Sequence, residues 1–270
     1  MKAQLPRKYK YRIRTLSTLA LSPRDHQGFY ESAGDFAQED LGQQASEHLN
    51  KGRVNIIYPF YQYGTYPRYA PAETQYYIPG SSIKGALTLN CTNIDRCSLM
   101  VDDIRVKSED IQLYHLTKVQ QDSENNKYYI DEFFPNVAIE MLRADSEHSG
   151  ELFCIETKSK PEPKHYFKEA DQAARIKLGQ LVQRINRKYE QVKIEDQPIL
   201  SEMKNNIQAI LNEPQDDSSN NFLLILGGYK GLTLSVISDR DDWDEYNSAI
   251  YLDKTKGLPY GLIKVTLEQP

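Results

Sequence analysis

The sequence predicts an α+β protein with an antiparallel sheet. One strand precedes a helix and several strands then follow, whereas a parallel sheet needs strands and helices in regular alternation. Short polar stretches at residues 122–126 and 145–150 separate two of the strand pairs, as expected for antiparallel hairpins. The 270 residues are enough for a sizeable core in one large domain or two small ones.

The charge of the chain is unevenly distributed. The formal net charge is −5, so no global positive field marks a nucleic-acid-binding protein. Residues 1–24 nevertheless hold seven Lys and Arg and no Asp or Glu, whereas residues 239–245 hold five acids. This asymmetry predicts one basic working face. The 19 tyrosines suit both base stacking and protein interfaces.

The cysteines, the histidines and the hydropathy of the chain exclude several classes of protein. Cys91, Cys97 and Cys154 are odd in number and lack zinc-site spacing, which favours a reduced, intracellular protein over a disulfide framework. The five histidines form no metal pair, so we expect no metal and no cofactor. No run of 18 apolar residues occurs and the N-terminus lacks an apolar signal core, so we expect a cytoplasmic protein without a membrane partner.

The first expected element is a strand over residues 9–21. Within it, Tyr11 and Ile13 alternate with Arg12 and Arg14, so apolar and basic side chains fall on opposite faces. A loop that contains a proline and a glycine then closes the strand.

An insertion follows over residues 29–74, where no periodicity persists. We expect a short helix within residues 39–48 and a strand-like patch within residues 55–63. Long loops are usually functional or mobile. The aromatic residues of this loop either stack nucleic-acid bases or pack the loop onto the domain. With one arginine among them they are Tyr58, Phe60, Tyr61, Tyr63, Tyr66, Arg68 and Tyr69.

Residues 76–87 carry the most specific pattern in the chain. An aromatic strand ends at a Pro-Gly turn, and the apolar spacing beyond it predicts a helix over residues 81–91. Ser81 or Ser82 is expected to cap this helix by accepting hydrogen bonds from its free amides. These amides, the two hydroxyls and Lys84 together offer a phosphate site. The position of Lys84 before its glycine excludes a nucleotide-binding P-loop, and a plain strand–turn–helix corner is the alternative.

Strands are expected over the middle of the chain. One covers residues 99–106, and residues 111–120 form a hairpin with residues 127–130. Residues 137–142 and 151–157 are expected to form another antiparallel pair.

The Pro-Glu-Pro sequence at residues 161–163 predicts a boundary between domains 1–160 and 161–270. A long amphipathic helix follows, with apolar residues at three- and four-residue steps. Residues 164–193 carry eight bases and three acids, which either face RNA phosphates or form the solvated side of the helix. A second helix is expected over residues 198–211, with a proline in its first turn.

The last third ends in two apolar strands. Residues 222–226 form a buried strand that runs into the glycine-rich turn 227–231, where a backbone or a phosphate can approach closely. The final strand covers residues 262–267.

The stretch Tyr77-Ile78-Pro79-Gly80-Ser81-Ser82-Ile83-Lys84-Gly85-Ala86-Leu87 resembles the signature of the RAMP superfamily of CRISPR-associated RNA-binding proteins, especially subunits of type III effector complexes. Many members continue with an arginine where this chain has Thr88. The resemblance implies a ferredoxin-like (RRM-like) antiparallel sheet with helices, modified by insertions and repeated in two subdomains. It also implies that the first helix lies beside bound CRISPR RNA (crRNA).

The resemblance further implies which residues contact crRNA, and it names other type III RAMP subunits as protein partners. The implied contacts come from the first strand and its loop, the signature, the strand after it and the glycine-rich turn. They are Arg12, Arg14, His26, Ser81, Ser82, Lys84, Arg105, Gly227, Gly228, Tyr229, Lys230 and Gly231.

We expect a non-catalytic structural subunit that binds crRNA and most resembles the subunit capping the type III-A backbone filament. Its role would be in crRNA 3′-end binding or maturation and in antiviral defence. The alternative is a RAMP-family endoribonuclease, or a backbone subunit that cleaves target RNA. Asp25, His26 and Asp35 are the candidate catalytic residues for that alternative, although nothing around them marks a tuned group. A third possibility is a scaffold that binds only protein, which suits the acidic composition.

Overall fold

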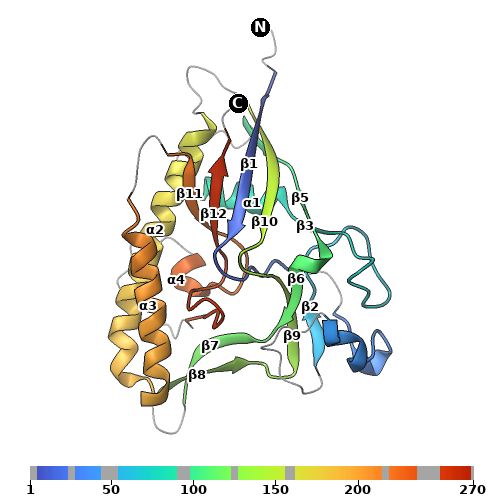
Figure 1. Ribbon diagram of the computed structural model, residues 1–270, viewed down its shortest axis with the longest axis vertical. Helices are drawn as coiled ribbons and strands as arrows, with labels where there is room; N and C mark the ends of the chain where they lie inside the picture. The colour runs from blue at the N-terminus through green and yellow to red at the C-terminus, as the bar shows by residue number, and fades with distance from the viewer. Residues whose placement is uncertain are drawn as a thin grey trace.

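The computed structural model describes residues 5–23, 28–43, 54–89, 98–122, 127–155, 162–214, 219–235 and 250–268, and it confirms the α+β class. Its largest sheet has five strands in the order β11-β12-β1-β10-β4, and all neighbouring strands are antiparallel (Figure 1). These strands are Asn221–Ile225 (β11), Leu262–Leu267 (β12), Arg7–Thr15 (β1), Glu147–Cys154 (β10) and Leu99–Val101 (β4).

The alternation predicted for the first strand is present in β1. Tyr11 and Ile13 are buried, whereas Arg12 and Arg14 are exposed. The buried side faces the helices, because the ring of Tyr11 lies 6.2 Å from that of Phe167. At β1 the sheet therefore has one face covered by helices and one face that carries charged side chains, whereas the edge strand β11 is buried on both faces.

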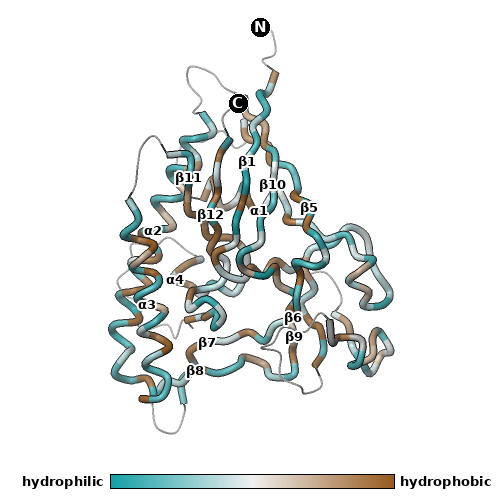
Figure 2. The backbone as a smooth tube through the Cα atoms, viewed as in Figure 1, coloured by the Kyte–Doolittle hydropathy of each residue, from teal (hydrophilic) through white to brown (hydrophobic). Residues whose placement is uncertain are grey.

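Two helices cover the buried face of the sheet, α1 (Gly80–Thr88) and α2 (Pro163–Lys188). α2 begins with Pro163, whose missing N–H would have no partner inside the helix. The N-terminal part of α2 packs with α1 and the sheet in one hydrophobic core. Its C-terminal part packs with α3 (Gln197–Leu211) in a second core. Figure 2 shows hydrophobic and hydrophilic stretches alternating along both α2 and α3, as expected for helices with one buried side.

Smaller sheets lie below and beside the main one in the view of Figure 1. One has the order β2-β9-β6, and two further pairs are β3-β5 and β7-β8. The β7-β8 pair confirms the predicted hairpin. The strands are Asn55–Tyr58 (β2), Val137–Leu142 (β9), Ile111–Tyr114 (β6), Tyr76–Ile78 (β3), Ile104–Val106 (β5), Leu116–Gln121 (β7) and Tyr128–Phe133 (β8).

The predicted pairing of residues 137–142 with residues 151–157 is wrong. β9 pairs with β2 and β6, whereas β10 pairs with β1 and β4. The connection between β9 and β10 is anchored to the end of β1, because Thr15 Oγ1 donates to Arg143 O at 2.8 Å and Asp145 N donates to Thr15 O at 2.8 Å. This anchor directs the two strands into different sheets.

Other element boundaries also differ from the prediction. The strand expected at residues 99–106 is two strands, separated by Asp102 and Asp103, and the segment 111–120 is divided at His115. Part of the helix expected near residues 39–48 is a 3₁₀ helix, and its remainder lies outside the described residues. The short helices are Glu31–Ala33 (η1), Gln38–Gln43 (η2), Ser108–Asp110 (η4), Tyr189–Gln191 (η5), Ile194–Asp196 (η6) and Gly231–Ser235 (α4).

The predicted boundary near residue 160 stays a prediction, and the five-stranded sheet takes strands from both sides of it. Within the described ranges, no helix is both long enough and apolar enough to cross a lipid bilayer.

Candidate nucleic-acid interface

A cleft of about 1110 Å³ lies between segments that are far apart in the sequence. The cleft is lined by one side of α1, one side of α2, the end of β11 and the glycine-rich turn that follows it. Leu232 and Ser235 of α4 also line it, and residues 20–22, Tyr58, Tyr61, Lys118 and Tyr251 complete the lining. The structure thus brings together the signature helix and the glycine-rich turn, two of the segments that the resemblance implied in RNA contact.

The charged residues that line the cleft are all lysines. They are Lys118, Lys177 and Lys230, and no Asp or Glu lines the cleft among the residues the structure describes. Lys177 is 5% exposed, and its Nζ donates to the carbonyl of Leu234 at 3.2 Å. The ammonium of Lys118 lies 3.3 Å from the centre of the Phe133 ring. None of these three has an ion pair with a described carboxylate, so the described lining of the cleft carries positive charge only.

Burial lowers the pKa of all three cleft lysines. It lowers the pKa of Lys230 to about 8, and the neighbouring charge of Lys177 acts in the same direction. Burial also lowers the pKa of Lys118 and of Lys177 below the usual lysine range. A bound anion would relieve this cost, because it favours the charged form of each lysine.

Four tyrosines add aromatic surface to the cleft. The centre of the Tyr229 ring lies 5.6 Å from that of Tyr58 and 6.2 Å from that of Tyr251, and both pairs pack edge-on. The fourth tyrosine is Tyr61. Tyr229 has a φ of 51°, in the left-handed region that a bulky side chain seldom adopts. Such outliers concentrate at functional sites.

The glycine-rich turn is shaped by two left-handed glycines. Gly227 and Gly231 have φ values of 82° and 74°. A Cβ on Gly227 would also overlap the carbonyl of Ala20, so both its conformation and its packing require glycine. Gly228 has no such constraint, since its nearest neighbour would be 3.9 Å from an added Cβ. Its amide donates to Ala20 O at 2.8 Å, which fixes the turn against the segment after β1.

The start of α1 differs from the prediction. The helix begins at Gly80, and neither Ser81 nor Ser82 caps it. The Gly80 amide instead donates to Asp103 Oδ1 at 2.7 Å. A carboxylate of the chain itself therefore lies where a phosphate was expected. Ser82 lines the cleft, whereas Ser81 and Lys84 are not among its lining residues.

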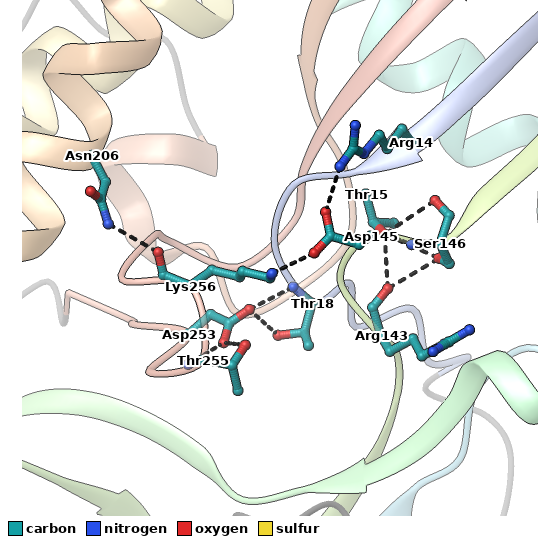
Figure 3. Close-up of polar contacts among 10 residues, drawn as sticks. All are labelled: Arg14, Thr15, Thr18, Arg143, Asp145, Ser146, Asn206, Asp253, Thr255 and Lys256. Carbon is teal, nitrogen blue, oxygen red and sulfur yellow. Dashed lines mark hydrogen bonds and ion pairs between the residues drawn. The ribbon is translucent and has the colours of Figure 1, made fainter.

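The predicted arginines lie away from the cleft. Arg12 pairs with Glu268 at 3.3 Å, on the sheet face opposite the helices. Arg14 on the same face donates to Asp145 at 2.9 Å, and Lys256 pairs with the same carboxylate (Figure 3). Arg105 is exposed on β5, opposite Tyr77.

The candidate catalytic residues do not form a site. Asp25 and His26 lie outside the described residues. Asp35 Oδ2 accepts a hydrogen bond of 2.8 Å from the amide of Tyr30, so this carboxylate stabilises the turn that contains η1. In the ranges that the structure describes, no group of three or more His, Cys, Asp or Glu side chains is arranged to hold a metal ion.

Most cleft residues were absent from the predicted site, among them Lys118, Lys177 and Tyr251. Lys177 belongs to the basic run of the long helix, where sequence alone could not separate a ligand-facing lysine from a solvated one. Lys118 and Tyr251 carry no local signal, because an isolated bridge between their two segments brings them to the cleft.

The chain matches no family model and no curated protein.

Proposed function

We propose that the cleft binds single-stranded RNA and that the chain is a non-catalytic crRNA-binding subunit of a type III CRISPR effector complex. One observation carries the proposal. In a protein with a net charge of −5, the described lining of the cleft holds three lysines, four tyrosines and no acid. Cations that neutralise phosphates, beside aromatic rings that stack bases, are the combination that binds single strands.

The residue types indicate which groups of the RNA each side chain would contact. Lys177 and Lys230 would neutralise phosphates, and Tyr61 and Tyr229 offer surfaces for unstacked bases. Lysine and tyrosine read charge and aromatic faces rather than base edges, so this binding is independent of sequence. In a guide-RNA complex, base pairing by the guide supplies the sequence specificity.

The strand order supports a ferredoxin-like core. The order β12-β1-β10-β4, with α1 between β1 and β4 in sequence and α2 between β10 and β12, is that of a βαββαβ unit. On this proposal β11 is an added edge strand, and the segments between β4 and β10 form an insertion. The meeting of the signature helix with the glycine-rich turn in one cleft supports the RAMP assignment.

Within such a complex, we place the chain at the end of the backbone filament, beside the crRNA 3′ end and other RAMP subunits, in the cytoplasm. The chain would serve antiviral defence there by holding crRNA. The endoribonuclease alternative gains no support from Asp35, which is engaged in a turn.

Purification of the protein from its native host, with extraction and sequencing of bound nucleic acid, tests this function. We expect short repeat-derived RNA together with other RAMP-like subunits. Assemblies free of such RNA would contradict the CRISPR assignment. Failure of the purified chain to bind any single-stranded RNA would contradict the function of the cleft itself.

A further inference from the structure

Gly85 lies inside α1 at a position where the fold gives no reason for a glycine. Its φ is not positive, and an added Cβ would meet no atom within 4 Å outside its own helix. Glycine in a helix interior lowers stability relative to alanine. Gly80 differs, because a Cβ there would overlap the carbonyl of Val101 in β4. Packing therefore requires Gly80 and leaves Gly85 unexplained.

Gly85 lines the cleft. Together with Ser82, Ala86 and Leu89 it forms a face of α1 with the spacing i, i+3, i+4 and i+7. Packing explains the small size of Ala86, which contacts the hydrophobic core. The described residues leave the space over Gly85 open to the cleft.

The other wall of the cleft has the same helical spacing. α2 contributes Ala170, Ala173, Ala174 and Lys177. Ala170 shares a core with α1, whereas Lys177 contacts the carbonyl of Leu234 in α4, next to the glycine-rich turn. Ala170 and Lys177 are two helical turns, about 10 Å, apart along the axis. Among the described lining residues, the cleft is therefore uncharged beside α1 and cationic beside α4.

These two ends suit different parts of a nucleotide. A phosphate needs cations or free hydrogen-bond donors. Lys177 provides a buried cation, because this residue is 5% exposed and has no described carboxylate partner. Beside Gly85 the amides are already bonded within the helix, and the neighbouring lining residues Ser82, Ala86 and Leu89 are uncharged, which suits the flat face of a base.

We propose that the bare backbone of Gly85 is the surface against which one nucleobase of the bound strand lies, with the adjoining phosphates toward Lys177 and Lys230. This inference rests on the proposed RNA binding and adds the orientation of the strand. The absence of a side chain at Gly85 lets the base approach the helix within van der Waals distance.

The variant Gly85→Ala tests this placement. We expect its melting temperature to be unchanged or raised by about 2 °C, because alanine is the better helix former. The Kd for a single-stranded RNA should rise about tenfold. The slope of log K against log salt should not change, since no phosphate contact is removed.

Gly179→Ala is the matched control. Gly179 is also inside a helix, has no atom within 4 Å of an added Cβ and does not line the cleft. It should show a similar thermal effect with an unchanged Kd. An abasic strand of the same length keeps the phosphates and lacks the bases, so it reports backbone contacts alone. We expect the wild type and Gly85→Ala to bind this strand equally.

Two results would overturn the inference while RNA binding stands: equal affinity of Gly85→Ala and wild type for intact RNA, or an equal loss for the abasic strand. If the wild type binds no RNA, the proposed function fails and this inference fails with it. That failure is visible in the wild type alone, before any variant is compared.

Discussion

Oδ1 of Asp103 accepts a hydrogen bond of 2.7 Å from the amide of Gly80, the first residue of α1. The carboxylate thereby meets the partial positive charge of the helix N-terminus. Its second oxygen accepts a hydrogen bond of 3.2 Å from Tyr63 Oη. The turn between β4 and β5 thus caps the signature helix, and the start of α1 has an anion supplied by the fold.

Asp103→Ala should lower the free energy of unfolding by about 1 kcal/mol, the usual effect of removing a helix N-cap. Asp103→Asn keeps an oxygen acceptor and should lose only a fraction of that amount. Chemical denaturation of the three proteins measures the difference. Equal stability of Asp103→Ala and wild type would show that the hydrogen bond does not support α1.

Tyr61→Ala should weaken binding of single-stranded RNA by about 1–3 kcal/mol, the range for loss of one stacked base, without changing the salt slope. Tyr63→Ala is the control. Tyr63 does not line the cleft, and its ring already stacks on Tyr77 with centroids 4.1 Å apart. Titration of labelled RNA into each variant checks this. Equal losses for both variants would remove Tyr61 from the interface.

Glu140 should make stability depend on pH. This carboxyl is 1% exposed and accepts hydrogen bonds from Tyr76 Oη at 2.5 Å and the Phe60 amide at 2.8 Å. Burial raises its pKa from 4.5 to about 7, although the hydrogen bonds act in the opposite direction. Between these two values the native state holds a proton that the unfolded state releases. Raising the pH from 4.5 to 7 should therefore lower the free energy of unfolding by up to about 3 kcal/mol.

Glu140→Gln cannot titrate at this position and should remove that part of the pH dependence. Denaturation of both proteins at several pH values between 4.5 and 8 gives the comparison. Parallel stability curves for wild type and variant would show that Glu140 does not keep its proton in the folded protein.

RNA affinity should fall at alkaline pH. The pKa of Lys230 is lowered to about 8 by burial and by Lys177, and a phosphate binds the charged form. Affinity should be constant below about pH 7 and should decrease above pH 8, by at most about tenfold per pH unit and by no more in total than the loss of this one contact. Binding measured from pH 6.5 to 9.5 at fixed ionic strength tests this, and Lys230→Met should flatten the profile. A flat wild-type profile would exclude Lys230 from the phosphate contact.

Local patterns predicted the elements that depend on local forces. The alternation around Tyr11, the hairpin β7-β8 and the long helix that starts at Pro163 all follow from the spacing of apolar residues and from turn residues. The pairing of β9 and β10 could not be predicted in this way. It depends on Thr15, which lies 128 residues from Arg143 in sequence and bonds to its carbonyl.

In the candidate site too, local sequence patterns predicted some features, whereas others depend on the tertiary fold. The glycine-rich turn was recognisable, because Gly227 and Gly231 need left-handed backbone. Local patterns favour the adjacent serines as the cap of α1, since none of them reveals that Asp103, 23 residues later, accepts a hydrogen bond from the Gly80 amide. The cleft lysines come from β7, α2 and the turn, so their convergence is a property of the tertiary fold.

The salt dependence of RNA binding tests the central claim most directly. Lys177→Met and Lys230→Met keep most of the apolar volume of each side chain and remove its charge. Lys84→Met is the matched control, because Lys84 does not line the cleft. We predict that the double variant at residues 177 and 230 reduces the slope of log K against log salt by about 1.4, or 0.7 per phosphate contact, and that Lys84→Met leaves the slope unchanged. An unchanged slope in the double variant, with circular dichroism showing an intact fold, would contradict the assignment of this cleft as the RNA-binding site.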